Sequence, residues 1–191
     1  MSDIFSKLAH EEIKFPMEEE LQELKEGFGY GEPNNIVVLA IDGTHIEAKK
    51  PQKYPFSYYN RHSTFSINII AIVDHKLRFR GVTYGFGRNH DSRVLRNSDL
   101  FEKINLIQNN CKIVGDPAFR CFRENNIIVP ETDNYSDENT LLKKQRVRVE
   151  NCFAIFKGKF KRFSGKVDAR ETNRGIKILY SSIFFTQFFH K

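Results

Sequence analysis

The sequence has no tryptophan, only two methionines and only three cysteines among its 191 residues. Cys111, Cys121 and Cys152 are odd in number and lack C-x-x-C spacing, so we expect reduced thiols rather than a disulfide framework or a zinc site. No cationic segment followed by an apolar stretch stands at the N-terminus, and we therefore expect a chain that is not secreted. The longest apolar stretch, residues 175–189, is short and interrupted by polar residues, which favours a buried helix over a membrane span.

Acidic residues are concentrated at one end of the chain. The formal net charge is +6, but residues 1–35 carry nine acids and three bases, so the remainder carries +12. Residues 143–166 contain nine Lys or Arg and a single acid, Glu150. Such a surface attracts polyanions, nucleic acid first. A solvated basic helix face is the alternative interpretation of the same composition.

The order of hydrophobic patterns predicts the fold class. In chain order we expect a helix after Pro16, strands at 36–42, 63–74 and 77–86, a helix at 90–104 capped by Asp91 or Ser92, a strand at 111–116, and helices at 139–163 and 171–189. Three early strands followed by alternating elements predict an α/β fold, a mixed sheet with helices on its faces. We divide the chain into an acidic helical segment, 1–35, and a larger domain, 36–191.

Three acidic residues are candidates for a metal site. Two predicted apolar strands end on aspartate, at Asp42 and Asp116, and ligands sit at the carboxyl ends of strands in open α/β sheets. Two such hard oxygen donors suit Mg²⁺, although each aspartate alone is explained as well by a turn or a cap. Glu150 lies beside the apolar stripe of its predicted helix, and an ion pair with Arg146 is the plainer interpretation there. The stripe consists of Val149, Phe153, Phe156 and Phe160.

Other polar residues near these acids have simpler explanations or weaker signals. His45 follows Asp42 by three positions and points to the other face if the strand continues, which argues against a ligand role. Helix capping explains Asp91 more simply than a role as a fourth acid. Several bases are candidates for phosphate contacts, which add affinity with little sequence preference. They are Arg61, Arg146, Lys157, Lys159, Lys161 and Arg162, with a solvated face as the alternative.

Five stretches of the chain, in order, resemble the PIF/Harbinger-type DDE transposases and their domesticated relatives, the Harbinger transposase-derived nucleases. The stretches are AIDGTHI, YYNRHSTFSINIIAIVD, HDSRVLRNSDL, IVGDPAF and NTLLKKQRVRVENCFAIFKGKFKRF. The resemblance implies an RNase H-like fold, a mixed sheet with helices on both faces, in which Asp42, Asp116 and Glu150 are the catalytic triad and the metal ligands. It also implies phosphodiester cleavage with two divalent ions, Mg²⁺ or in its place Mn²⁺, roughly 3.5–4 Å apart.

The resemblance leaves three functions open. Only about 35 residues precede the first strand, where the family has a helix-turn-helix-like segment. The first is a metal-dependent DNA endonuclease or transposase catalytic domain. The second is a domesticated, catalytically inactive DNA-binding or scaffold protein, and a weaker third is an RNA-acting RNase H-like enzyme. Implied partners are DNA, a Myb-like DNA-binding protein and a second copy of the chain on DNA, without a membrane. The implied location is the nucleus, or also the cytoplasm if import depends on the partner.

Overall fold

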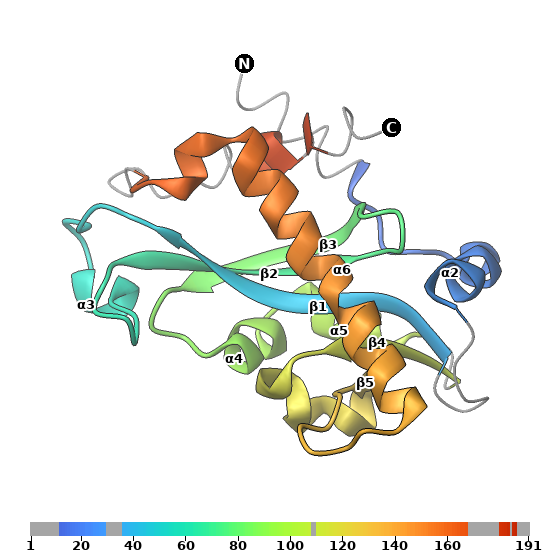
Figure 1. Cartoon of the computed structure of the whole chain (residues 1–191). Helices are drawn as coiled ribbons and strands as arrows, with labels where there is room; N and C mark the ends of the chain where they lie inside the picture. Colours follow the sequence, from blue (N-terminus) through green and yellow to red (C-terminus); the bar gives the residue numbers. More distant parts are fainter. Residues whose placement is uncertain (1–11, 30–35, 108–109, 168–179, 184, 187–191) are drawn as a thin grey trace.

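The structure is a computed structural model and describes residues 12–29, 36–107, 110–167, 180–183 and 185–186. A five-stranded sheet in the order β3-β2-β1-β4-β5 forms its centre (Figure 1). β1 pairs antiparallel with β2 and parallel with β4, so the sheet is mixed. The predicted α/β class with a mixed sheet is therefore confirmed. The strands are β1 (Ile36–Glu47), β2 (Ser66–Val73), β3 (Phe79–Phe86), β4 (Cys111–Gly115) and β5 (Ile127–Ile128).

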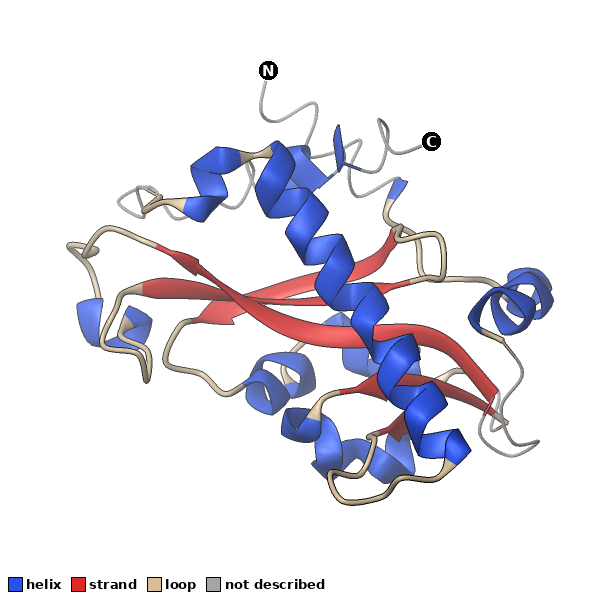
Figure 2. Cartoon of the chain, in the orientation of Figure 1, coloured by secondary structure: helices blue, strands red, loops and turns tan. Residues whose placement is uncertain are grey.

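Helices cover both faces of this sheet, with α6 crossing one face and the shorter helices α4 and α5 on the other (Figure 2). The helices are α2 (Leu21–Phe28), α3 (Pro55–Tyr58), α4 (Asp91–Arg96), α5 (Asp99–Asn105) and α6 (Asp137–Lys159). Short 3₁₀ helices span Glu18–Glu20, Pro117–Asn125 and Lys161–Ser164. In the described part of the chain, no helix combines the length and the apolar character that crossing a bilayer requires.

Two apolar cores lie on opposite faces of the sheet. Under α6, the side chains of Val149, Phe153 and Phe156 are buried in one cluster, and Phe160 packs against that cluster. The apolar stripe predicted for this helix is therefore confirmed. On the other face, residues of α2, α4 and α5 form a second cluster with Leu39 and other strand residues. The sheet is thus held between two layers, and its strand ends are the places where polar groups gather.

The first strand is longer than predicted. β1 runs to Glu47, so the expectation that it ends at Asp42 is wrong. The reason is long-range pairing: β2 accompanies β1 as far as the pair Glu47–Ser66, whereas β4 accompanies it only to the pair Ile41–Gly115. Asp42 therefore lies inside β1, at the point where one of its two neighbouring strands ends.

The predicted helix at 90–104 is two helices, α4 and α5, separated at Asn97 and Ser98. Ser98 has extended backbone angles (φ −127°, ψ 155°), and its hydroxyl donates to the carbonyl of Leu95 at 2.7 Å, which interrupts the helix. The N-cap of α4 is His90, whose Nδ1 accepts from the N–H of Ser92 at 3.4 Å. The prediction that Asp91 or Ser92 caps this helix is therefore wrong.

The helix predicted at 139–163 is α6, which begins slightly earlier and ends at Lys159 because Phe160 leaves the helical region (φ −114°, ψ 73°). Of the helix predicted at 171–189, residues 180–183 and 185–186 are helical and the others lie outside the described residues.

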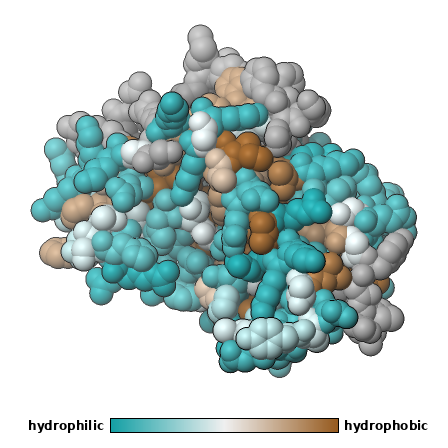
Figure 3. Space-filling view, viewed as in Figure 1, coloured by the Kyte–Doolittle hydropathy of each residue, from teal (hydrophilic) through white to brown (hydrophobic). Residues whose placement is uncertain are grey.

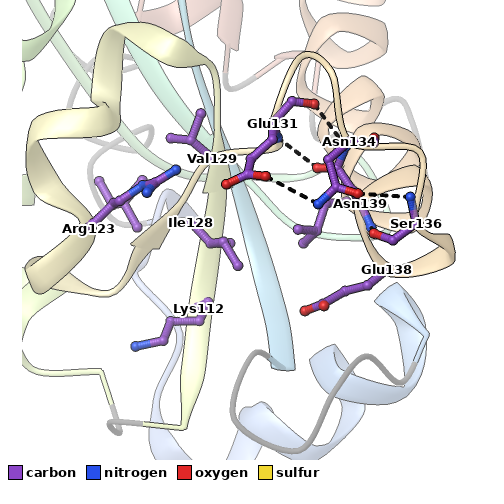
Figure 4. Close-up of a pocket in the computed structure, with 11 residues that line it drawn as sticks. Lys112, Arg123, Ile128, Val129, Glu131, Asn134, Ser136, Glu138 and Asn139 are labelled. Carbon is purple, nitrogen blue, oxygen red and sulfur yellow. Dashed lines mark hydrogen bonds between the residues drawn. The ribbon is translucent and has the colours of Figure 1, made fainter.

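The start of α6 is fixed by one asparagine. The side-chain oxygen of Asn139 accepts from the N–H of Glu131 at 2.7 Å, and its amide nitrogen donates to the carbonyls of Glu131 (2.8 Å) and Asn134 (2.5 Å). Ser136 caps the helix by accepting from the N–H of Asn139 at 3.2 Å. Figure 4 shows these residues converging on the first turn of α6. These hydrogen bonds of Asn139 tie α6 to the loop that follows β5, and so fix the position of the later residues of α6.

Candidate active site

Asp42 and Asp116 lie next to each other because their strands are parallel neighbours. The last pair between β1 and β4 is Ile41–Gly115, and each aspartate is the next residue of its strand. Both line one cavity of about 650 Å³. The structure thus brings together the first two predicted acids, by the strand adjacency that the sequence suggested.

Each of the two carboxylates is held by a backbone N–H close to it in the chain. Asp42 Oδ1 accepts from the N–H of Gly43 at 2.7 Å. Asp116 Oδ1 accepts from the N–H of Ala118 at 2.9 Å, as the N-cap of the 3₁₀ helix Pro117–Asn125. Asp116 therefore also has the capping role that the sequence left open as its alternative. A cap fixes the direction of the carboxylate and does not remove it from the cavity.

A third acid, Asp91, lines the same cavity. Its Oδ1 accepts from the side-chain amide of Asn68 at 2.6 Å, so its carboxylate is fixed to β2. A methyl group placed on Gly43 would lie 2.6 Å from Asp91 Oδ2, which means that only glycine at this position lets Asp91 approach β1 so closely. The sequence favoured helix capping over a role as a fourth acid for Asp91, but His90 is the cap and Asp91 lines the cavity. The available signal was an acid soon after the end of β3, as Asp116 follows β4.

Burial and neighbouring acids raise the pKa of two carboxyl groups in the cavity. The pKa of Asp42 is raised to about 7, mainly by burial and to a smaller extent by the charges of Asp116 and Glu150, while the hydrogen bond from Gly43 lowers it. Burial also raises the pKa of Asp116, and the charge of Asp91 adds to the effect. Arg146 opposes the rise of both pKa values. A cavity of this kind favours a bound cation.

Glu150, the third predicted acid, lies on the exposed side of α6 next to the buried Val149. Its Oε1 is 2.5 Å from a guanidinium nitrogen of Arg146, so the ion pair that was the plainer interpretation is present. Its charge still acts on Asp42, as the pKa of that carboxyl shows. The structure therefore places Asp42 and Asp116 on one cavity and Glu150 beside them, paired with Arg146.

The donors of the cavity fit a divalent cation in their chemistry. Asp42, Asp91 and Asp116 present carboxylate oxygens, the hard donors that Mg²⁺ prefers. The raised pKa values of Asp42 and Asp116 reflect burial and like-charge repulsion, and a cation would relieve both. As the side chains lie, no three His, Cys, Asp or Glu residues among the described ones are arranged to hold a metal ion. Within that part of the chain, a full coordination sphere requires side-chain rearrangement, for which Glu150 is the obvious candidate.

His45 also lines the cavity. Its Nδ1 lies 2.8 Å from the hydroxyl of Ser66, which in turn accepts from the amide of Asn60 at 2.8 Å. Burial lowers the pKa of His45, so its neutral form is favoured. The chain of contacts holds the ring against β2, which gives His45 a structural role.

The predicted phosphate-binding residues fall into three groups. Arg61 is exposed and lines the cavity. Lys159 and Lys161 are exposed where α6 ends. Arg146 is paired with Glu150, as described above. The side chain of Arg162 lies outside the described part of the structure.

Lys157 is placed differently from the other predicted bases. Its ammonium group donates to Thr44 Oγ1 at 2.7 Å and to the carbonyl of His45 at 3.3 Å, which joins α6 to β1. Burial lowers its pKa. Lys157 therefore holds the helix that carries Glu150 against the strand that carries Asp42.

Comparison with known proteins identifies one similarity. The model of the family described as DDE superfamily endonuclease matches residues 41–186 of the chain. The match begins one residue before Asp42 and includes Asp91, Asp116 and Glu150. No curated protein and no solved structure matches the chain.

Proposed function

The chain belongs to the DDE superfamily endonucleases, and from this premise we propose that it is a metal-dependent DNA endonuclease or transposase catalytic domain of the PIF/Harbinger type. The family supports a nuclease or transposase type of function. The observation that supports the finer proposal is the cavity at the strand ends, which Asp42, Asp91 and Asp116 line and where the pKa of Asp42 is raised to about 7.

The residues proposed to hold metal are Asp42, Asp116 and Glu150, with Asp91 as a supporting acid. Two divalent ions, Mg²⁺ or Mn²⁺, supply an activated nucleophile and stabilise the leaving oxygen when they are bound. The chain's own contribution is to hold the acids in place. Gly43 and Ala118 orient the first two carboxylates, and Asn68 orients Asp91. Glu150 joins this set by exchanging its pairing with Arg146, and the guanidinium then becomes available to a phosphate.

Bases at the cavity and at the end of α6 are proposed to position the DNA backbone. Arg61 at the cavity, and Lys159 and Lys161 at the end of α6, present charge to phosphates without reading sequence. Arg162 belongs to the same basic segment of the sequence. Lys157 acts in a different way, by fixing α6 to β1.

Partners and location follow from the same proposal. We expect DNA as substrate, a Myb-like protein that supplies sequence-specific DNA binding, and a second copy of this chain on the DNA. Action on chromosomal DNA places the protein in the nucleus, and in the cytoplasm as well if import depends on that partner.

A catalytically inactive DNA-binding or scaffold protein is the second candidate. The observation that favours it is the pairing of Glu150 with Arg146 at 2.5 Å, outside the cavity that the aspartates line. If that pair persists in the presence of metal, the third ligand is missing. The two candidates therefore differ in one measurable property, the exchange of Glu150 from Arg146 to metal.

The test is cleavage of supercoiled plasmid with Mg²⁺ or Mn²⁺ by the wild type and by Glu150→Gln. Loss of transition-state charge stabilisation predicts that the variant is slower by about 100-fold or more. Glu102→Gln, the same change on an exposed residue of α5, is the matched control and should cut at the wild-type rate.

Three other outcomes would change the assignment. Equal rates for wild type and Glu150→Gln would show that the triad is wrong. No cleavage by either protein, with Mg²⁺ still bound in calorimetry, would favour the inactive protein. Faster cutting of an RNA duplex than of DNA would favour the RNA-acting enzyme.

A further inference from the structure

One loop next to the cavity exposes aromatic side chains that proteins normally bury. We call residues 49–62, between β1 and β2, the aromatic loop; it contains α3. Tyr54 is 76% exposed, Phe56 79% and Tyr59 44%. Large aromatic rings lose a favourable burial energy when they stay in water, so three on one loop indicate a ligand that covers them.

The kind of apolar group narrows the class of ligand. Each exposed large hydrophobic side chain of the aromatic loop is a ring. The exposed aliphatic ones, Met17, Leu106 and Val147, lie elsewhere in the described structure. Planar rings without aliphatic neighbours suit a planar partner, such as a nucleobase.

The charge around these rings points to the same ligand. Lys49, Lys50, Lys53 and Arg61 are exposed on the loop, which contains no acid. Figure 3 shows small brown patches among hydrophilic atoms at the end of the molecule where α3 lies. Exposed rings interleaved with cations are the combination by which proteins bind unpaired nucleic-acid strands, rings for the bases and cations for the phosphates.

The backbone holds two of the rings outward. Tyr54 has a left-handed conformation (φ 52°, ψ 46°), which is strained for an aromatic residue and needs surrounding support. That support comes from buried Tyr58, whose ring packs edge-on against Phe86 at 5.0 Å, and from Tyr59, which packs against Phe65 at 5.4 Å. Tyr54 and Phe56 thus project from an anchored turn.

The aromatic loop is joined directly to the wall of the cavity. The N–H of Arg88 donates to the carbonyl of Ser57 at 3.1 Å, and Arg61 and Arg88 both line the cavity that contains Asp42. A DNA strand whose phosphate lies at Asp42 therefore has the aromatic loop within reach of its neighbouring nucleotides.

We propose that the aromatic loop is a stacking platform for unpaired DNA bases beside the phosphate that is cut, with Tyr54 and Phe56 as the stacking rings. The inference rests on the proposed function and adds the form of the substrate, an end or junction at which bases are unpaired. Bases inside a closed duplex are already stacked on each other and do not offer their faces to the loop. The platform is tolerant of sequence, because every base has an aromatic face.

The absence of tryptophan makes the test direct. Phe56→Trp introduces the protein's one tryptophan, whose fluorescence a stacked base quenches. The metal-free variant is titrated with a short oligothymidylate and, separately, with a blunt duplex of equal phosphate number. We expect quenching by the oligothymidylate and little by the duplex. Leu106→Trp, at an 85% exposed position at the end of α5, is the matched control and should respond to neither.

Affinity provides an independent measurement. Removing one stacked ring, in Phe56→Ala or Tyr54→Ala, should weaken binding of the oligothymidylate by about 5- to 100-fold and leave duplex binding nearly unchanged. Lys53→Ala should weaken both ligands alike, because it removes only charge. Quenching equal for the two ligands, equal in the two tryptophan variants, or absent in Phe56→Trp would overturn the platform.

The platform and the proposed function fail in different ways. Plasmid cleavage without quenching would overturn the platform and keep the nuclease. Quenching with an inactive protein would support the platform and overturn the nuclease. A protein partner instead of DNA would appear as an aromatic loop that binds neither oligonucleotide, which also overturns the platform.

Discussion

The two halves of β1 belong to one continuous strand but have different surroundings. From Val37 to Ile41 no residue is more than 1% exposed. β4 pairs with β1 along this half, and β2 joins it at Ala40, so Ala40 and Ile41 have a neighbouring strand on both sides. From Asp42 to His45 the residues are partly exposed, because β4 has ended and only β2 continues. The comparison shows how a polar site arises within one strand. β4 ends beside Ile41 while β1 continues, so the space beyond the end of β4 is lined by Asp42 of β1 and by Asp116, which follows β4.

The first half fixes the second half in place. Its residues are covered on both faces, and one-residue shifts of register would move apolar side chains to the wrong face. Asp42 inherits this precise position although a half-buried carboxylate is unfavourable by itself, as its pKa of about 7 shows. Residues up to Ile41 thus stabilise the fold, whereas the next residue, Asp42, is a candidate site residue whose burial costs stability.

The largest expected effect on stability comes from a substitution in the buried first half of β1. Ile41 is fully buried in the core beneath α4 and α5, and Ile41→Ala should reduce the free energy of unfolding by about 3 kcal/mol, since it deletes buried methyl groups and leaves a cavity. Urea denaturation followed by circular dichroism measures this change. Leu106→Ala, at an exposed position, is the control and should change little. A loss as small as the control's would show that the first half is not what anchors the site.

The sequence predicted the sheet and its apolar halves because strand patterning is local. Asp116 follows β4 as expected, since a strand's last apolar residue is visible in the sequence. The end of β1 was misplaced because its length depends on pairing with β2, which no local pattern contains. Asp91 was taken for a helix cap for a similar reason: its close approach to Gly43 joins residues far apart in the chain.

The residue pattern and the family resemblance predicted different roles for Asp116 and Glu150. From the residues alone, Asp116 was as well explained by a cap and Glu150 by a pair with Arg146, and the structure contains both interactions. The resemblance proposed their shared role, and the structure adds the common cavity of Asp42 and Asp116. A side chain can make a local interaction and still belong to a site, so the cap and the ion pair do not exclude a shared role for these acids.

A substitution in the second half of β1, at Asp42, should raise the free energy of unfolding, whereas Ile41→Ala in the first half lowers it. Asp42 keeps its proton to a pH of about 7 in the folded state, whereas the unfolded chain releases it near pH 3.8, so the folded state binds more protons in between. Stability of the metal-free wild type should therefore fall as pH rises from about 4 to 7. Asp42→Asn removes the contribution of Asp42 to this slope and leaves that of Asp116, and the variant should be more stable than wild type by about 2 kcal/mol at pH 7.5.

Thermal unfolding with and without Mg²⁺ extends the same measurement. Mg²⁺ should raise the melting temperature of the wild type, because it binds the folded state, and should have little effect on Asp42→Asn. Glu102→Gln is the control, with wild-type pH and metal responses. A wild-type stability that rises from pH 4 to 7 would contradict the burial of Asp42 as a charged group.

The smallest effect concerns the bond that holds α6 to the second half of β1. Lys157 Nζ donates to Thr44 Oγ1 at 2.7 Å, and Thr44→Val removes the acceptor with little change of shape. We expect a loss of about 1 kcal/mol in the free energy of unfolding, because Lys157 keeps its contact with the carbonyl of His45. A double-mutant cycle with Lys157→Met isolates the interaction. If the two residues are coupled, the double variant should lose less unfolding free energy than the sum of the losses of the two single variants. Additive losses would mean that α6 and its Glu150 are positioned by the apolar stripe alone.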